Sequence, residues 1–291
     1  MTRTPQPRRL SLKVRIEPEV AGTVCDYLAA ETGLSKSKIK AAMQKGAVQL
    51  HRPGRGRKRI RRATAPLAPG DRLELHYDEQ ILAVAPPVAC CLADFSRFSV
   101  WFKPAGLLTQ GTSYGDHCAL VRQVEKHFDS QRPVLAVHRL DREATGLVLL
   151  AHGREAAARL SRLFYRREVE KVYRATVRGE IGPPAGSGQI DRPLDGKSAV
   201  TGYTVLSFDP ASNTSRLEIR TGSGRKHQIR RHLASTGHPV MGDPAYGRGN
   251  KTAGGLQLCA TRLSFTCPYQ RRLVVFDLQR LQPDHGCHAC S

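Results

Sequence analysis

Residues 136–151 read AVHRLDREATGLVLLA, and they are the most informative stretch of the chain. Two apolar segments flank a turn with five ionisable side chains: His138, Arg139, Asp141, Arg142 and Glu143. The apolar segments have the length and composition of buried strands. Because proteins build sites on loops held by rigid strands, the turn is a candidate site. Taken alone, it is better explained as a turn capped by Asp141 with its arginines in solvent.

Around this turn, short strands alternate with a few helices. Strands are predicted at 99–102, 135–137, 147–151, 172–177, 200–208, 216–220, 257–265 and 272–278. Helices are predicted at 119–127, 155–165 and 226–236. Most of the strands follow one another without a crossover helix. The pattern therefore predicts an α+β domain with a mixed, largely antiparallel sheet.

The composition indicates a folded, strongly basic protein. The chain has 291 residues, with 46 Lys and Arg against 25 Asp and Glu, a net charge of +21, and 40% hydrophobic residues. These values exclude a wholly disordered chain and favour a polyanionic partner, usually nucleic acid, over a membrane surface. The longest apolar run is too short to cross a bilayer, and the N-terminus lacks the apolar core of a leader. We therefore expect a cytoplasmic protein with no membrane partner.

No metal or other cofactor is expected. Eight cysteines are scattered without a secretory context, so free thiols are the expectation. Cys287 and Cys290 have the spacing of half a zinc site, but no second pair of ligands accompanies them. Gly222 and Gly224 lack the third glycine of a dinucleotide-binding loop, and no Walker-type loop is present.

The first 80 residues form a separate basic module. They carry 17 Lys and Arg against 8 Asp and Glu and are more basic per residue than the rest. Helices are predicted at 23–31 and 35–45, and a hairpin from strands near 48–50 and 73–75. Between these strands lies RPGRGRKRIRR, at 52–62. Such a run is often a solvated loop, but in a basic module phosphate contact is the stronger expectation. The candidate RNA-binding residues are Lys36, Lys38, Lys40, Arg55, Arg57, Lys58, Arg59, Arg61 and Arg62.

This module resembles the S4-type RNA-binding domain. The motifs GLSKS at 33–37, GAV at 46–48 and GDRL at 70–73 match that family in order. The basic run at 52–62 departs from it, because the family has a shorter polar connection there. The resemblance implies a small S4-like α/β RNA-binding domain over residues 9–80.

The turn at 136–151 is similar to the signature of the RluA-type pseudouridine synthases, which isomerise uridine in structured RNA. The family has Thr-Ser-Gly where this chain has Ala144-Thr145-Gly146. Four further blocks occur in the family's order: KPAGL at 103–107, EKVY at 170–173, GRKHQIR at 224–230 and GHPVMGD at 237–243. The resemblance implies the pseudouridine synthase fold over 97–281, after a linker at 81–96 and before a tail at 282–291. The family's histidines in Leu-His-Ala and His-Pro are replaced by Cys259 and Cys267, so their role is performed differently or was only packing.

The resemblance also implies roles for five residues. Asp141 would be the catalytic carboxylate, Tyr173 would stack on the target base, and Arg230 would pair with Asp141. Leu258 would pack in the pocket, and Arg139 would enter the RNA stack when the target uridine is flipped out. The carboxylate could stabilise or trap a cationic sugar, attack the base, or remove a sugar proton, and the sequence leaves these routes open. With 6% aromatic residues, recognition should rest on charge and RNA shape.

These expectations describe a monomeric isomerase that converts uridine to pseudouridine in RNA. The S4-like module favours large-subunit ribosomal RNA over transfer RNA, by family analogy. One alternative is a non-catalytic RNA-binding or ribosome-assembly factor, which the presence of Asp141, Tyr173 and Arg230 opposes. Another is a glycosylase that uses Asp141 to activate water and releases free uracil.

Overall fold

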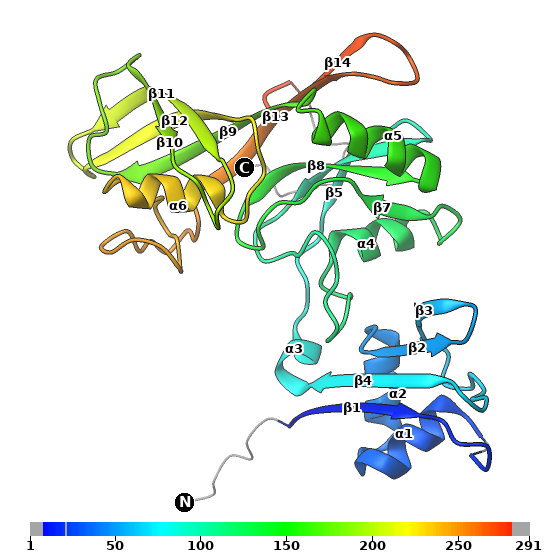
Figure 1. Cartoon of the computed structure of the whole chain (residues 1–291). Helices are drawn as coiled ribbons and strands as arrows, with labels where there is room; N and C mark the ends of the chain where they lie inside the picture. The colour runs from blue at the N-terminus through cyan, green and yellow to red at the C-terminus, as the bar shows by residue number, and fades with distance from the viewer. Residues whose placement is uncertain (1–7, 21, 281–291) are drawn as a thin grey trace, which may run out of the picture. The chain divides into compact units, whose positions relative to one another are not determined.

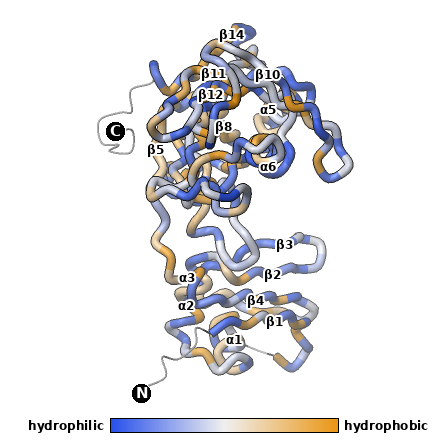
Figure 2. The backbone as a smooth tube through the Cα atoms, turned by 90° about the vertical axis from the view of Figure 1, so that its left-hand side faces the viewer, coloured by the Kyte–Doolittle hydropathy of each residue, from blue (hydrophilic) through white to orange (hydrophobic). Residues whose placement is uncertain are grey.

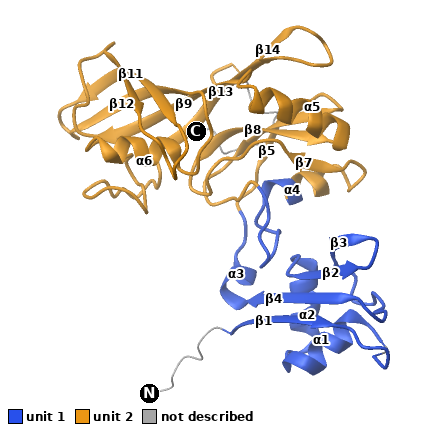
Figure 3. Ribbon diagram, in the orientation of Figure 1, with its two compact units in different colours: residues 1–86, 110–122 blue, residues 87–109, 123–291 orange. Residues whose placement is uncertain are grey.

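The computed structural model describes residues 8–20 and 22–280, which form two compact units (Figure 1). The first unit holds the described residues up to Pro86 together with Gln110–Arg122, and the second holds Pro87–Thr109 and the described residues from Gln123 on (Figure 3). No pattern in the sequence predicts that residues 110–122 group with the first unit. The predicted tail at 282–291, with Cys287 and Cys290, lies outside the described residues.

The first unit is a four-stranded antiparallel sheet with α-helices packed against it. Its strand order is β1-β4-β2-β3. The elements are β1 (Arg9–Arg15), α1 (Val24–Thr32), α2 (Lys36–Gln44), β2 (Val48–Arg52), β3 (Gly56–Arg59), β4 (Arg72–Asp78) and α3 (Glu79–Ala83). Helices α1 and α2 and strands β2 and β4 confirm the prediction, whereas β1, β3 and α3 were not predicted.

The two helices begin and end where their capping residues stand. The Thr23 hydroxyl accepts the Asp26 N–H at the start of α1, and Gly33, at φ 62°, ends that helix in the left-handed conformation. The Ser35 hydroxyl accepts the Lys38 N–H at the start of α2. These side chains explain why the sequence predicted both helices.

The basic run is not a plain loop. It forms a hairpin in which β3 pairs antiparallel with β2, from Gln49 opposite Arg59 to Arg52 opposite Gly56. Strand β3 is hydrophilic throughout (Figure 2), so it lacks the alternation by which a strand is recognised in sequence.

The second unit is built on a ten-stranded sheet within the described residues. The path β10-β11-β12-β9-β13-β8-β6-β5 is extended by β14 beside β13 and β7 beside β8. Every described pair is antiparallel except β13 with β8, which confirms a mixed, largely antiparallel sheet. The strands are β5 (Cys90–Asp94), β6 (Phe98–Lys103), β7 (Val134–Ala136), β8 (Thr145–His152), β9 (Glu170–Arg178), β10 (Ser187–Asp191), β11 (Val200–Asp209), β12 (Thr214–Thr221), β13 (Leu258–Thr266) and β14 (Leu273–Asp277). The helices are α4 (Leu120–His127, whose first residues count with the first unit), α5 (Arg154–Tyr165) and α6 (Gln228–Ser235). None of the described helices is long and apolar enough to cross a membrane.

The segment 81–96 is not a bare linker, as the sequence had suggested. It contains the end of α3 and all of β5, which pairs with β6 from Cys90 opposite Phe102 to Asp94 opposite Ser99. A register irregularity between Cys91 and Ala93 breaks the strand's alternation. That irregularity explains why β5 was not predicted.

Strand β13 joins the two hydrophobic clusters of the second unit. Its Leu263 and Phe265 belong to the cluster around β6, β8 and α5, and its Leu258 to the cluster around β9, β12 and α6. Gly146 on β8, at φ 114°, lies against Ala260 so closely that an added Cβ would be 2.3 Å from the Ala260 oxygen. This close parallel contact places the turn before β8 next to β9 and β13.

Candidate active site

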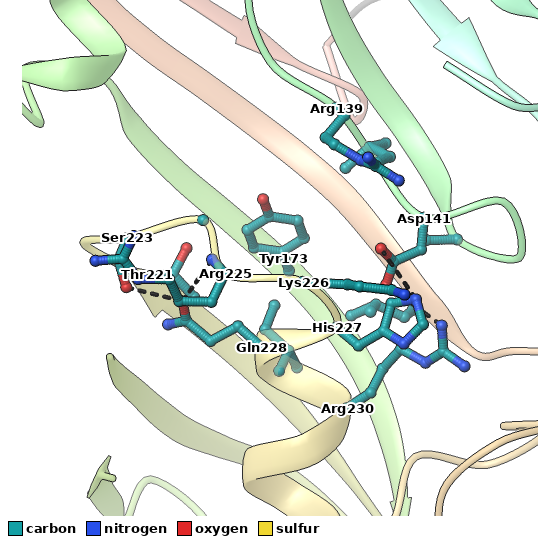
Figure 4. A pocket seen from close by; sticks show the side chains of 15 residues that line it. Arg139, Asp141, Tyr173, Thr221, Ser223, Arg225, Lys226, His227, Gln228 and Arg230 are labelled. Atoms are coloured by element: carbon teal, nitrogen blue, oxygen red, sulfur yellow. Dashed lines mark hydrogen bonds and ion pairs between the residues drawn. The ribbon is translucent and has the colours of Figure 1, made fainter. Parts of the chain in front are cut away.

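A cavity of about 300 Å³ in the second unit is lined by the residues that the sequence singled out (Figure 4). Its wall comes from the turn before β8, the middle of β9, the end of β12, the start of α6 with the loop before it, and the start of β13. Asp141, Tyr173, Arg230, Arg139 and Leu258 all line it. The fold therefore brings together five residues from four distant segments of the chain.

The turn that carries Asp141 is fixed by a buried lysine. Lys103, at the end of β6, donates from Nζ to three main-chain oxygens, those of Pro104 (2.8 Å), Leu107 (2.8 Å) and Arg142 (3.2 Å). Burial lowers the pKa of Lys103 to about 8, against the opposing effect of Glu143 and Asp141. The three N–H groups of an ammonium match the three acceptors, so this side chain ties β6 to the turn.

Two further contacts hold the same turn. The Thr109 hydroxyl donates to the Leu140 carbonyl (3.0 Å) and accepts the Leu140 N–H (3.1 Å). His138 accepts the Leu149 N–H at Nε2 (2.9 Å) and stacks on Phe164. Burial lowers the pKa of His138 to about 3, so its imidazole is neutral at neutral pH. The turn that carries Asp141 is therefore held in place by hydrogen bonds before and after Asp141.

Arg230 on α6 links three carboxylates. Its Nε and Nη2 donate to both oxygens of Asp243, at 2.8 and 2.7 Å, and Nη1 lies 3.4 Å from Asp141 Oδ2 and 3.3 Å from Glu143 Oε2. The Arg230 side chain is 1% exposed and Asp243 is fully buried. Burial would raise the pKa of Asp243, but hydrogen bonds from Arg230 and from the N–H groups of Ala245 and Tyr246 lower it. The predicted pairing of Arg230 with Asp141 is present in the structure.

Tyr173 lies on β9 opposite Ala260 of β13 and Ile219 of β12. Burial and the charge of Asp141 raise the pKa of Tyr173 to about 12, against a hydrogen bond with Thr221 that lowers it. The phenol is therefore neutral at neutral pH and offers one O–H donor, lone pairs and an aromatic face to the cavity.

The rim of the cavity is cationic. Arg139 and Lys226 are exposed, and the Arg225 side chain donates to the Ser198 carbonyl. Gln228 fixes the loop that precedes α6, because its Oε1 accepts from Ser223 Oγ (2.8 Å) and from the Arg225 N–H (3.1 Å). Three positive side chains at the mouth suit an anionic substrate.

Three further residues of the site stand in the matched motif blocks, but their sequence context predicts no role for them: Lys103, Asp243 and His227. His227 lies directly before α6, with Nδ1 2.9 Å from the Tyr246 hydroxyl and Nε2 3.8 Å from Asp141 Oδ1. The signal that could have identified these residues is their place in the motifs. An ionisable residue inside a matched motif is a candidate site residue even before its partner in the fold is known.

The candidate RNA-binding residues of the first unit fall into two groups. Lys36, Lys38 and Arg57 form exposed ion pairs, whereas Arg59 and Arg61 are half-buried against Asp116, at 3.2 and 2.5 Å. The remaining four are exposed and make no ion pair with any described residue: Lys40, Arg55, Lys58 and Arg62. In the same described part of the chain, no three His, Cys, Asp or Glu side chains are grouped to hold a metal ion.

Comparison with known proteins identifies the class of this chain as an RNA-modifying isomerase. Residues 97–235 match the RNA pseudouridylate synthase family. The chain is 33% identical over 196 residues to the dual-specificity RNA pseudouridine synthase RluA of Pasteurella multocida, covering 62% of this chain and 88% of the relative. It is 32% identical over 213 residues to the ribosomal large subunit pseudouridine synthase D of Zymomonas mobilis, covering 62% and 65%.

A solved structure, human RNA Pseudouridylate Synthase Domain Containing 4, has the same fold. It is 26% identical with a TM-score of 0.52, and the match covers 65% of this chain and 87% of that one. The chain belongs to the RluA-type RNA pseudouridine synthase family, whose members convert uridine in RNA to pseudouridine.

Proposed function

We propose that this chain isomerises specific uridines in large-subunit ribosomal RNA, with Asp141 as the catalytic carboxylate. The observation that carries the proposal is the meeting of Asp141, Tyr173 and Arg230 in one cavity of about 300 Å³. A uridine inside a helix is out of reach of such a cavity, so the target must be flipped out of the stack. The cavity has the volume of a small-ligand site and suits one nucleobase with its sugar.

In this proposal, Asp141 acts on the sugar or the base of the flipped nucleotide. Its side chain is 17% exposed, which leaves it accessible from the cavity, while Arg230 and the braced turn fix its position. The reaction breaks the bond between C1′ and N1, turns the base and joins C1′ to C5, with no redox change. A fixed carboxylate serves this by stabilising or trapping the cationic sugar, by attacking the base, or by removing a sugar proton.

The other cavity residues receive the base and the RNA strand. The aromatic face of Tyr173 stacks on the uracil, and the buried Leu258 supplies an apolar wall. Arg139 stands exposed at the rim and fills the space that the flipped uridine leaves, because a planar guanidinium both stacks and binds phosphate.

The first unit is proposed to be an S4-like RNA-binding domain over residues 9–80, with the catalytic domain over 97–281. Its sheet with two helices and its exposed Lys40, Arg55, Lys58 and Arg62 support RNA contact. The name of the Zymomonas relative supports ribosomal RNA as the substrate. Transfer RNA is the competing substrate. We also propose that the protein is a monomer and is located in the cytoplasm.

The experiment is a map of pseudouridines in total RNA from cells with and without the gene. We expect one or more positions in large-subunit ribosomal RNA to be lost on deletion and restored by the wild-type gene. The Asp141→Asn gene serves as the matched control and should restore none. Restoration by Asp141→Asn would reject the catalytic role, and lost positions confined to transfer RNA would reject the substrate. Release of free uracil by the purified protein would indicate a glycosylase.

A further inference from the structure

His227 contacts both the candidate catalytic carboxylate and a tyrosine hydroxyl. Its Nε2 lies 3.8 Å from Asp141 Oδ1, and its Nδ1 lies 2.9 Å from Tyr246 Oη. The side chain is 20% exposed and lines the cavity with Asp141. Figure 4 shows His227 beside Asp141 and Arg230 at one side of the cavity.

The backbone of His227 is held in an unusual conformation. Its φ is 53°, in the left-handed region, and its side chain makes no capping hydrogen bond to α6. Non-glycine residues in this region cost free energy, and they persist where the surrounding structure fixes them, often at functional sites. The conformation turns the imidazole away from the helix start and between Asp141 and Tyr246.

The imidazole is neutral at neutral pH, so its tautomer matters. Burial lowers the pKa of His227, as do the positive charges of Arg230 and Lys226, against the opposing effect of Asp141 and Glu143. A neutral imidazole has one N–H and one lone pair. If Nδ1 carried the proton, the Nε2 lone pair would face the negative Asp141. If Nε2 carries it, the N–H faces Asp141, and Nδ1 accepts from the Tyr246 hydroxyl.

We infer that His227 is a positioning residue for Asp141, held by the Tyr246 hydroxyl in the tautomer that directs Nε2–H at Asp141 Oδ1. Arg230 Nη1 approaches the other oxygen, Oδ2, at 3.4 Å. A donor on each oxygen restricts rotation of the carboxylate and keeps it aimed at the flipped nucleotide. The 3.8 Å contact is longer than a hydrogen bond, and catalytic contacts of this kind often shorten once the substrate is bound. The inference rests on the proposed role of Asp141.

Two substitutions at one position separate this role from a merely structural one. His227→Gln places an amide N–H near the position of Nε2, whereas His227→Asn places it near Nδ1. Asparagine tolerates the left-handed backbone better than glutamine, so backbone strain alone would favour the Asn variant. Tyr246→Phe keeps the ring beneath Arg230 and removes only the hydroxyl that fixes the tautomer.

The rates are measured in single turnover, with the protein in saturating excess over unmodified ribosomal RNA from the deletion strain, alongside RNA affinity. We expect His227→Asn to lower the saturating rate by about ten- to one-hundredfold with unchanged affinity, and His227→Gln to retain most of the rate. Tyr246→Phe should lower the rate by less than His227→Asn. Equal losses in the Asn and Gln variants, or losses in affinity alone, would overturn the inference.

The tautomer is read directly from ¹⁵N chemical shifts of the imidazole, assigned by the signal missing in His227→Gln. The wild type should show Nε2–H, and Tyr246→Phe should show a mixture of tautomers. An Nδ1–H tautomer in the wild type would overturn the inference whatever the activity. A wild type that modifies no RNA rejects the proposed function instead, and the two failures are therefore distinguishable.

Discussion

Arg230 and Asp243 form a bidentate ion pair in the interior of the second unit, with N–O distances of 2.8 and 2.7 Å. The pair leaves a single guanidinium nitrogen, Nη1, to reach Asp141 and Glu143. Asp243 also accepts the N–H groups of Ala245 and Tyr246, so a main-chain turn aims it. The position of Arg230 beside Asp141 is therefore set by a residue outside the lining of the cavity.

Asp243→Asn should reduce both stability and rate. It removes the charge opposite a buried guanidinium and turns one acceptor into an N–H donor, so we expect a loss of about 3 kcal/mol in the free energy of unfolding. The rate at saturating RNA should fall as well. Urea unfolding and single-turnover kinetics check the two effects. Asp195→Asn is the matched control, because it breaks an equally bidentate but exposed pair with Arg231 and should change neither quantity measurably. If Asp243→Asn changed neither the stability nor the rate, Asp243 would not be the residue that holds Arg230 in place.

Asp141→Asn should abolish isomerisation and leave RNA affinity nearly intact. The amide keeps the shape of the side chain and loses its charge, and the loss of an essential group costs orders of magnitude in rate. Glu143→Gln is the comparison, because Glu143 also contacts Arg230 Nη1 and is more exposed, at 36%. It should lower the rate far less. Comparable losses in both variants would mean that the negative charge around Arg230, rather than Asp141 itself, is what the reaction needs.

Local signals made much of the fold predictable. The caps at Thr23, Gly33 and Ser35 and the apolar runs of β6 and β8 act over a few residues, and the elements they specify are present. Strand β3 was not predictable, because its four residues are stabilised by pairing with β2 and carry no apolar pattern of their own. Residues 110–122 group with the first unit through contacts between segments far apart in sequence, such as those of Asp116 with Arg59 and Arg61.

The residues of the candidate site also fall into two groups: those that the sequence predicted and those that only the folded chain reveals. Asp141, Tyr173 and Arg230 stand in motifs that could be matched block by block. The functions of Asp243 and His227 depend on partners that only the folded chain supplies, so their type and spacing did not reveal a role. The apposition of Gly146 and Ala260 is likewise a product of a parallel strand pair that no local pattern indicates.

Gly146→Ala should strongly destabilise the second unit. A Cβ there would lie 2.3 Å from the Ala260 oxygen and 2.5 Å from its nitrogen, so β8 and β13 would have to separate. We expect a loss of more than about 3 kcal/mol, as for overpacking combined with backbone strain. Gly196→Ala is the control, because Gly196 also has a positive φ, of 71°, with no atom near its added Cβ. It should lose only about 1 kcal/mol. Thermal or urea unfolding measures both losses. Similar losses at both positions would show that the positive φ, and not the close contact with Ala260, causes the destabilisation.

His138 should make stability fall on the acid side of neutrality. The pKa of His138 is about 3 in the folded chain, against the ordinary value of 6.5. Between these values the unfolded chain binds a proton that the folded chain does not, so stability is lost as the pH falls. One such proton corresponds to about 1.4 kcal/mol per pH unit. His138→Gln keeps an acceptor for the Leu149 N–H and removes the titration. Between pH 6.5 and pH 4, the free energy of unfolding measured with urea should therefore fall less steeply for the variant than for the wild type. Equal slopes would contradict the low pKa of His138.

The basic run at 52–62 should contribute to RNA affinity through those exposed cations that form no ion pair with a described residue. Arg55, Lys58 and Arg62 are exposed, whereas Arg59 and Arg61 are half-buried against Asp116. If the exposed three contact phosphates, replacing them with glutamine should weaken binding and reduce the slope of log K against log salt by about 0.7–0.9 for each contact. The rate at saturating RNA should stay the same, because phosphate contacts are made equally before and during the reaction.

Replacing Arg59 and Arg61 instead is the matched comparison for this salt dependence. Their loss leaves Asp116 without its cations, so we expect the first unit to lose stability, with a smaller change in the salt slope per charge removed. Binding at several salt concentrations, followed by single-turnover rates at saturation, measures both variants. An unchanged slope in the triple variant would mean that these three cations are solvated and contact no phosphate. A slower saturating rate would mean that these cations also help to place the target uridine, because only contacts that strengthen in the transition state change that rate.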